Sequence, residues 1–295
     1  ERWRKILTYV SDALFVPDNK LGWKRQALKR AEELFARKPF DVVFATAPPF
    51  TDFLIGKELA DKFHVPLVVD YRDPWHDYPY KYYPTPLHRW RNYVLEKRVL
   101  HAASRIITTN RRVKELILKR FKFIHYNDVT ILPQGFDPAD FTEGIVQVRN
   151  AEKMRITHAG LFYGDRTPRY FLEALRKLFA ERPELKPHIE AYFVGNMLDE
   201  HKELVKSLGL EENVTLTGYL DHLRCVQMLT ASDVLWVMLD NDRQSPGKVY
   251  EYLGARKPIL ACVPEGFVRQ TIKEADSSFI VAPTEQKMGV VQRIF

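Results

Sequence analysis

The sequence predicts an α/β fold with two domains, each built around a parallel sheet. Short apolar runs of strand length alternate with amphipathic helical segments from residue 41 onwards. The chain has 295 residues, which favours two domains, and its hydrophobic fraction of 45% is ordinary for a protein with full cores. Because residues 142–153 are polar and without pattern, we predict domains at 1–145 and 146–295.

The charge balance points to an acidic partner. The 45 basic and 38 acidic residues leave a net charge of +7, which suits an anionic membrane face or a phosphorylated substrate. Nucleic acid is not expected as a partner, since no zinc-finger spacing or RNA-recognition motif is visible. No apolar run reaches the length of a membrane span. Cys225 and Cys262 lie in apolar surroundings and are expected to be buried free thiols of an intracellular protein.

The first feature along the chain is a basic, aromatic stretch at 1–38. From Trp23 to Phe35 the apolar residues follow helical spacing, with basic residues between them. Such a helix can lie on an anionic bilayer, or it can be a surface helix packed on its own domain. We favour the second interpretation, and charge balance alone does not separate the two.

The following segments predict a parallel βαβ unit. They are a strand at 41–46, a helix at 53–63 and a strand at 66–70. Ligands gather at the carboxyl ends of such strands, so Asp70, Arg72 and Asp73 are candidate site residues. A carboxylate there could polarise an acceptor hydroxyl, and the arginine could hold a phosphate. The structural alternative is a helix cap or an ion pair among these side chains.

Aromatic residues crowd the next loop, at 75–93. This loop is expected to be either a packed lid or an acceptor surface, since aromatic rings stack on sugars and also sit at membrane interfaces. The rest of the first domain is predicted as a helix ending at 101, a strand at 104–109, a helix at 111–121 and a strand at 129–133.

The second domain alternates more regularly. Its strands are predicted at 155–159, 188–194, 214–216, 234–239, 258–263 and 279–282, with helices between them. The turn after the first strand contains Gly160 and Arg166, followed by Thr167 as a predicted N-cap. This is the first strand–helix junction of a Rossmann-like half, where phosphates bind. It does not match G-x-G-x-x-G, so a dinucleotide is not indicated.

The stretch at 245–261 reads as a loop, a short helix, a turn and a buried strand. Ser245 is predicted as the N-cap, which leaves the N–H groups of Gly247 and Lys248 as an anion site. Lys248 and Glu251 share a helix face, and a cation beside a carboxylate suits a nucleotide-sugar better than a bare phosphate. The alternative is a surface ion pair. Asp240 and Asp242 read as a solvated loop, and no metal site is expected.

The set of motifs resembles bacterial glycosyltransferases of the GT-B fold, in the family 4-like group. It comprises the segments 41–49, 69–75, 132–137, 160–166, 214–219, 231–234 and 245–261. The resemblance implies two Rossmann-like domains facing a cleft, the C-terminal one holding a nucleotide-diphosphate sugar and the N-terminal one the acceptor. It further implies retention of anomeric configuration, without a metal or other cofactor.

Residue by residue, the resemblance implies donor and acceptor sites. The diphosphate would lie near Gly160, Arg166, Ser245, Gly247 and Lys248, the base near Tyr219 and Leu220, and the ribose at Glu251. Asp70, Arg72 and Asp73 fall where the family often keeps catalytic or acceptor-binding groups.

Two departures stand out. Arg243 occupies the position of the glutamate that usually touches the donor sugar, so the donor stays open. The usual opening strand is not visible before residue 41 and the usual final helices are missing, so the N-terminal domain is expected to be incomplete.

The predicted function is that of a glycosyltransferase of hexosyltransferase type. It would move a sugar from a nucleotide-diphosphate donor to a glycan or lipid-linked acceptor in cell-surface polysaccharide or glycolipid assembly. We expect a cytoplasmic protein, peripheral on the inner face of the plasma membrane. The alternatives are a nucleotide-sugar epimerase of the same fold and a non-catalytic, membrane-associated subunit.

Overall fold

The computed structural model describes residues 9–79, 81–141, 152–163, 166–275 and 278–281. The chain forms two compact units, Glu1–Pro133 and Gln134–Phe295, here called unit 1 and unit 2. The division falls ahead of the domain boundary that the sequence suggested at 145/146, and most of the predicted link lies outside the described residues. No helix among the described residues is long and apolar enough to cross a bilayer.

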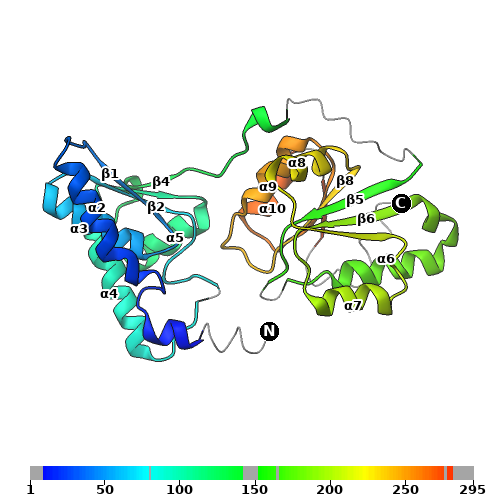
Figure 1. The fold of residues 1–295 in the computed structure, drawn as a ribbon, viewed down its shortest axis with the longest axis horizontal. Helices are drawn as coiled ribbons and strands as arrows, with labels where there is room; N and C mark the ends of the chain where they lie inside the picture. Colours follow the sequence, from blue (N-terminus) through cyan, green and yellow to red (C-terminus); the bar gives the residue numbers. More distant parts are fainter. Residues whose placement is uncertain (1–8, 80, 142–151, 164–165, 276–277, 282–295) are drawn as a thin grey trace. The chain divides into compact units, whose positions relative to one another are not determined.

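Unit 1 contains a four-stranded parallel sheet in the order β1-β2-β3-β4 (Figure 1). The strands are β1 (Val43–Ala47), β2 (Leu67–Tyr71), β3 (Arg105–Thr108) and β4 (Val129–Ile131). The helices between them are α3 (Thr51–Phe63), α4 (Pro86–Ala102) and α5 (Arg111–Arg120). Consecutive strand order with right-handed crossovers puts all three helices on one face of the sheet.

Alternation along the strands builds the core of unit 1 on that helical face. Ala45, Val69 and Ile106 point into one apolar cluster that also takes residues from α3, α4 and α5. On the opposite face of the sheet Phe44 is 59% exposed and Val68 is half-buried. The predicted βαβ unit is therefore present, with helices covering one side of its sheet.

The basic helix near the start of the chain is α2 (Lys24–Phe35), preceded by a 3₁₀ turn, η1 (Leu21–Trp23). It packs on α3, where the rings of Phe35 and Phe63 stack with their centroids 3.9 Å apart. Lys24 pairs with Glu58 at 2.6 Å, which ties the same two helices together. These contacts support the interpretation of α2 as a surface helix of its own domain. The most N-terminal basic residues lie outside the described residues.

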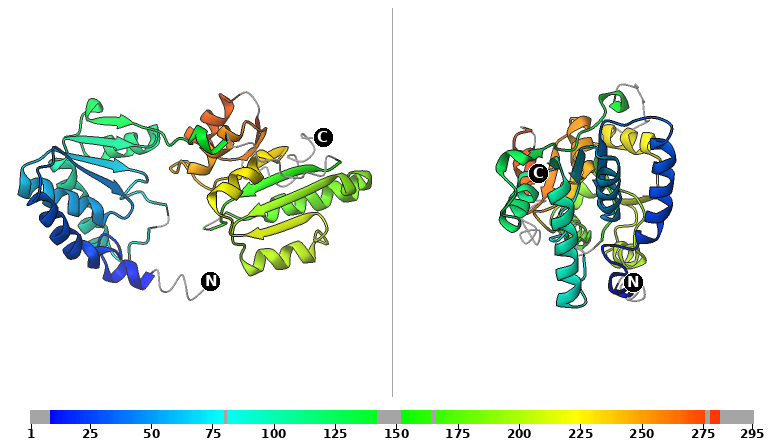
Figure 2. Two further views of the ribbon diagram at one scale, coloured as in Figure 1. Left: turned by 45° about the horizontal axis from the view of Figure 1, so that its top comes forward. Right: turned by 90° about the vertical axis from the view of Figure 1, so that its left-hand side faces the viewer.

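Unit 2 contains a six-stranded parallel sheet in the order β10-β9-β8-β5-β6-β7 (Figure 2). The strands are β5 (Met154–Ala159), β6 (Ile189–Val194), β7 (Val214–Gly218), β8 (Val234–Met238), β9 (Ile259–Cys262) and β10 (Ser278–Val281). The helices are α6 (Arg169–Glu181), α7 (Asp199–Ser207), α8 (His222–Thr230), α9 (Gly247–Ala255) and α10 (Phe267–Lys273). The chain runs outward from β5 in one direction and then from β8 in the other, so strand order reverses between these two neighbours.

Two apolar cores lie on the two faces of this sheet. One contains Leu172 of α6 and Val205 of α7, and the other contains Leu229 of α8, Val249 of α9 and Ile272 of α10. Helices therefore cover both faces, which is the doubly wound Rossmann-like arrangement that the alternation predicted. In such sheets the ligand crevice forms at the carboxyl ends of the strands where the order reverses, here between β5 and β8.

The predicted caps of two helices in unit 2 were wrong in detail. Helix α9 begins at Gly247, and Pro246 occupies its cap position with an extended backbone and no capping side chain. Ser245 therefore does not cap the helix, because its hydroxyl lies 3.0 Å from the Tyr250 hydroxyl instead. In α6, Pro168 holds the cap position and the Thr167 hydroxyl accepts from the N–H of Arg169 at 3.2 Å.

Candidate functional site

The carboxyl edge of the unit 2 sheet is built from closely packed backbone. The N–H of Gly160 donates to the carbonyl of Val194 at 2.8 Å, and the N–H of Gly195 donates to Gly218 at 2.9 Å. A Cβ added to Gly195 would lie 2.8 Å from the carbonyl oxygen of Gly160. Gly195 also has a φ of +127°, which L side chains rarely adopt. The loops after β5, β6 and β7 are thus held together at a distance that only glycine permits.

The N-terminus of α9 faces this edge with free donors. Among the described residues, no group accepts from the backbone N–H of Gly247 or Lys248. Lys248 Nζ lies 3.4 Å from the Glu251 carboxylate and 3.4 Å from Cys225 Sγ. The Lys248 side chain is 37% exposed and that of Glu251 is 21% exposed. The two side chains form the expected pair, and both remain accessible to a ligand.

Two contacts that sequence reasoning missed hold α9 in place. Gln134 donates from Nε2 to the carbonyl of Ser245 at 2.7 Å, immediately before the helix. Tyr252, one helical turn further on, accepts from the N–H of Ala159 at 2.8 Å and donates to the carbonyl of Trp236 at 3.2 Å. Because Ala159 ends β5, the hydroxyl joins the helix to the turn at Gly160. Neither contact has a local sequence signal, since each joins segments far apart in the chain.

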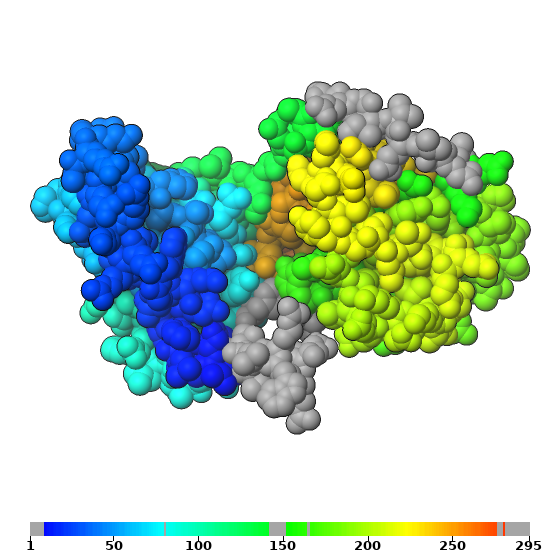
Figure 3. Space-filling model, viewed as in Figure 1, coloured from blue at the N-terminus to red at the C-terminus, as the bar shows by residue number. Residues whose placement is uncertain are grey.

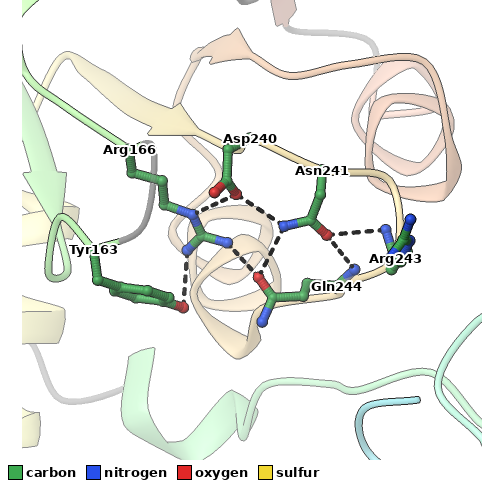
Figure 4. Close-up of polar contacts among 6 residues, drawn as sticks. All are labelled: Tyr163, Arg166, Asp240, Asn241, Arg243 and Gln244. Atoms are coloured by element: carbon green, nitrogen blue, oxygen red, sulfur yellow. Dashed lines mark hydrogen bonds and ion pairs between the residues drawn. The ribbon is translucent and has the colours of Figure 1, made fainter. Parts of the chain in front are cut away.

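Arg166 is the centre of a buried polar network (Figure 4). It donates to Asp240 at 3.1 Å, to Gln244 at 2.6 Å and to the Tyr163 hydroxyl at 3.0 Å. Only 8% of the Arg166 side chain is exposed, and 11% of that of Asp240. The guanidinium charge is therefore balanced within the protein, and the loop after β8 is pinned to the turn after β5. Asp240 is not the solvated carboxylate that the sequence suggested, because Arg166 buries it.

His158 lies in β5 two residues before Gly160 and is 8% exposed. Its Nδ1 is 2.9 Å from the carbonyl of Trp236, and since a carbonyl can only accept, Nδ1 carries the proton. Its Nε2 is buried without a hydrogen-bond partner. Burial, together with the smaller effect of the nearby charges of Lys248 and Arg166, lowers the pKa of His158 to about 4, although the hydrogen bond to the carbonyl of Trp236 opposes this. The imidazole is therefore neutral, and both cations lie close to the end of β5.

The two residues predicted to lie beside the base follow β7. Tyr219 is 79% exposed and Leu220 is half-buried against the core that contains α8 and α9. The tyrosine ring is free to stack on a planar ligand.

In unit 1 the predicted catalytic residues follow β2. Asp70 is 6% exposed and accepts from the Thr46 hydroxyl of the neighbouring strand at 2.9 Å. Arg72 Nη1 lies 3.7 Å from the Asp70 carboxylate, and about half of its side chain is exposed. Asp73 is half-buried. The structure thus brings Asp70 and Arg72 together, with the carboxylate held in place by Thr46 and the guanidinium exposed at the carboxyl edge.

The aromatic loop after Asp73 is divided between core and surface. Trp75 is fully buried, stacks on Phe50 at 5.0 Å and donates to Asn92 at 2.9 Å. Trp90, by contrast, is 60% exposed at the start of α4, and Tyr82 is 43% exposed. The expected loop therefore ends at Thr85, because α4 begins at Pro86; its beginning is packed structure, and the exposed rings are Tyr82 in the loop and Trp90 in the helix.

A carboxyl group is buried beneath this region. Glu96 is 2% exposed, and its Oε1 accepts from the Tyr71 hydroxyl at 3.3 Å while its Oε2 has no partner. Burial raises the pKa of Glu96 to about 8, although the charge of Arg120 opposes this. The carboxyl group is therefore largely protonated near neutral pH.

Cys225 and Cys262 are buried free thiols, as expected.

Comparison with known proteins identifies the two halves of the chain separately. A family model described as Glycosyltransferase Family 4 matches residues 3–140, and one described as Glycosyl transferases group 1 matches residues 145–294. A search of curated proteins found no match. No group of three or more His, Cys, Asp or Glu side chains that could hold a metal ion occurs among the described residues.

Solved structures with the same fold share little sequence with this chain. Anabaena Alr3699/HepE in complex with UDP and glucose has a TM-score of 0.67 at 16% identity, covering 90% of this chain and 70% of that one. Sucrose-phosphate synthase from Thermosynechococcus elongatus has a TM-score of 0.66 at 16% identity, covering 93% and 69%. A putative UDP-N-acetylglucosamine 2-epimerase from Listeria monocytogenes has a TM-score of 0.57 at 16% identity, covering 92% and 70%.

These findings agree with the architecture described above. Two parallel, Rossmann-like sheets in one chain form the GT-B fold of the first two of these structures. The group 1 family model spans the whole sheet of unit 2, from before β5 to beyond β10, and the family 4 model spans the whole sheet of unit 1. The chain therefore belongs to the glycosyl transferases group 1 family and is a glycosyltransferase of the GT-B fold, with a family 4 N-terminal domain.

Proposed function

We propose that this glycosyltransferase moves a hexose from a nucleotide-diphosphate donor to a glycan or lipid-linked acceptor. The main support comes from the start of α9. Two N–H groups there have no acceptor among the described residues, and Lys248 lies beside them. A helix N-terminus and a lysine supply positive charge for the leaving diphosphate without a metal ion. Glu251, on the same helix face, supplies an acceptor for the hydroxyls of the ribose.

The remaining donor contacts follow from the edge of the unit 2 sheet. The tight turn at Gly160 lets the diphosphate approach the backbone, and the exposed ring of Tyr219, with Leu220 beside it, receives the base. Arg166 and Ser245 act on the donor through the loops that they hold, because their side chains are buried and engaged. UDP is the first nucleotide to test, since the Anabaena structures contain it.

On the acceptor side, we assign the chemistry to Asp70, Arg72 and Asp73. Asp70, oriented by Thr46, would hold or polarise the acceptor hydroxyl, and Arg72 would meet negative charge on the acceptor or the leaving group. The transfer would retain anomeric configuration and serve cell-surface polysaccharide or glycolipid assembly, with the protein peripheral on the cytoplasmic face of the membrane.

Titration calorimetry with UDP, GDP and dTDP tests the donor site. One nucleotide should bind clearly, and Lys248→Gln should weaken that binding by about ten- to a hundred-fold, the range of a charged hydrogen bond. Lys202→Gln on α7, which removes a surface lysine paired with Asp199, is the matched control and should leave binding unchanged. If none of the three nucleotides binds, the proposed donor site is wrong.

The epimerase alternative is supported by the fold shared with the Listeria protein. It is separated by incubating the protein with UDP-sugars in deuterated water without any acceptor. Incorporation of deuterium at a sugar carbon would favour an epimerase, whereas transfer to an added acceptor without such incorporation supports the glycosyltransferase.

A further inference from the structure

Large apolar side chains are exposed where α4 begins. Leu87 is 58% exposed and Trp90 is 60% exposed, and because they are three positions apart they lie on the same side of the helix. Arg91, four positions after Leu87, continues this stripe and is also exposed. The buried side of the same helix contributes Val99 and Leu100 to the core of unit 1. Helix α4 is therefore apolar both inside, where it packs, and on part of its outer side.

A second segment adds to this surface. The carbonyl of Ala13 is 3.1 Å from His88 Nε2 on α4, and the rings of Tyr9 and Tyr82 are 4.4 Å apart. Residues 9–17 therefore lie against the start of α4, and Figure 3 shows both segments on the molecular surface. Leu14 of this segment is 70% exposed.

We call the exposed outer side of α4 at Leu87, Trp90 and Arg91 the α4 face; Leu14 and Phe15 of the segment that contacts His88, and Tyr82 before the helix, lie beside it and are also exposed. Exposed apolar groups gathered on one surface indicate an interaction site rather than ordinary solvent exposure.

The charge around the α4 face has a single sign on the helix itself. Helix α4 contains Arg89, Arg91, Lys97 and Arg98, and its one carboxyl group, Glu96, is buried. Arg91, Lys97 and Arg98 have no acidic partner among the described residues. On α2, by contrast, Lys24 and Arg30 are paired with glutamates. The solvent side of α4 thus presents cations with no exposed carboxylate of the helix itself between them, and only Arg98 lies in a hollow that also contains Glu58 and Asp61 of α3.

We propose that the α4 face binds the surface of an anionic lipid bilayer. Trp90, Leu87 and Leu14 would enter the interfacial region, where tryptophan and aliphatic side chains are favoured, and Arg91 would meet the lipid phosphates. An acidic protein could satisfy the arginine, but it would leave three large apolar side chains without apolar contacts. The proposal rests on the peripheral membrane localisation proposed above but not on the donor site, so vesicle binding and nucleotide binding can fail independently of one another.

Co-sedimentation with lipid vesicles tests the proposal. The full chain should bind vesicles of phosphatidylcholine mixed equally with phosphatidylglycerol, and bind vesicles of pure phosphatidylcholine much less. Arg91→Gln should weaken binding by about five-fold, the contribution of one arginine near an anionic surface. Leu87→Ser combined with Trp90→Ser should weaken it by roughly ten-fold, and Trp90→Phe should keep most of it.

Matched variants separate this surface from general attraction between charges. Lys202→Gln combined with Lys206→Gln removes two cations from α7, where both are paired with carboxylates, and should leave vesicle binding unchanged. Thermal unfolding of every variant should match that of the original chain, since all these side chains are exposed. Equal binding to both vesicle types overturns the proposal. The proposal is also overturned if the α7 variant loses as much vesicle binding as the α4 variant. Binding of polyglutamate by a chain that does not sediment with vesicles also overturns the proposal.

Discussion

At the scale of single residues, Lys248 and Glu251 show how one helical turn can carry two different contacts. Their 3.4 Å pair is partly exposed, so its own contribution to the free energy of unfolding is small. A nucleotide would replace this weak pair with two contacts of opposite kind, a phosphate on the lysine and a hydroxyl on the glutamate. The pair therefore keeps both side chains oriented at little cost when the site has no ligand.

Glu251→Gln tests the contact with the ribose. If the carboxylate accepts from the hydroxyls, the original chain should prefer UDP over 2′-deoxy-UDP by about ten-fold, and the variant should lose most of this preference. The affinity for UDP should fall less than it does in Lys248→Gln, because the diphosphate contacts remain. Calorimetry with both nucleotides measures the effect. An unchanged preference in the variant would remove Glu251 from the ribose site.

The buried carboxyl group of Glu96 makes the stability of unit 1 depend on pH. The pKa of Glu96 is raised from 4.5 to about 8 by burial, so the folded state holds a proton that the unfolded state releases above pH 4.5. The contribution of Glu96 to the free energy of unfolding should therefore be fully present below pH 4.5 and fall as the pH rises to about 8, by at most about 1.4 kcal/mol per pH unit.

Glu96→Gln is the matching variant for this dependence. The amide keeps the shape of the protonated acid and does not titrate. The variant should therefore lack this part of the fall in the free energy of unfolding and be more stable than the original chain near pH 8. Urea unfolding followed by tryptophan fluorescence, with Trp236→Phe in both chains, reports unit 1, because the other four of the five tryptophans lie there. Parallel pH profiles of the two chains would contradict the raised pKa.

Sequence reasoning at the residue scale succeeded where the signal was local and failed where it was not. The pairing of Lys248 with Glu251 follows from helical spacing and is confirmed. The state of Arg166 could not be predicted, because Asp240 and Gln244 are more than seventy positions away along the chain. The role of Ser245 was missed for a different reason: its hydroxyl turns to Tyr250, only five positions on, and the helix starts one residue later than predicted.

At the scale of elements, the turns at the edge of the unit 2 sheet depend on glycine packing. Gly195→Ala should place a methyl group 2.8 Å from the carbonyl oxygen of Gly160 and also strain a φ of +127°. We expect a loss of about 1–3 kcal/mol in the free energy of unfolding and weaker UDP binding, because the Gly160 turn must move.

Gly209→Ala is the control for this substitution. Gly209 also has a positive φ, of +65°, but an added Cβ would meet nothing within 4 Å. The variant should lose about 1 kcal/mol of its free energy of unfolding, because of backbone strain, and keep its full affinity for UDP. Thermal unfolding and calorimetry measure both effects. If the two variants lose the same affinity, the close approach of Gly195 to Gly160 has no part in donor binding.

The order and type of the elements could be predicted, because apolar periodicity is a local property. The predicted strands at 188–194 and 214–216 became β6 and β7 with ends displaced by at most two residues. The position of β8 beside β5 could not be predicted in the same way, since it depends on a crossover past two intervening strands. That adjacency is what brings Arg166 and Asp240 together, so the buried network of the site depends on topology.

At the scale of the whole molecule, the chain from Gln134 to Phe141 belongs physically to unit 2. Phe136 and Phe141 pack so closely on Gly254 of α9 that an added Cβ would lie 2.7 Å from each ring. Asp140 lies 2.8 Å from His222 at the start of α8. The composition of 142–153 suggested a later boundary, but composition carries no information on which unit an apolar side chain contacts. The first residues of unit 2 therefore cover α9, which carries the proposed contacts of Lys248 and Glu251, and α8 beside it.

Two fragments of unit 2 test this boundary. A fragment of residues 134–295 keeps the segment over α8 and α9, whereas a fragment of 146–295 lacks it. The shorter fragment should be less stable by about 2–4 kcal/mol, from two lost aromatic contacts and the hydrogen bonds of Gln134 and Asp140. It should also bind UDP more weakly, because Gln134 no longer holds the carbonyl of Ser245 before the start of α9. Phe136→Ala with Phe141→Ala in the full chain should reproduce most of the loss of stability. Equal unfolding midpoints and equal UDP affinity for the two fragments would show that the segment 134–141 contributes nothing to unit 2.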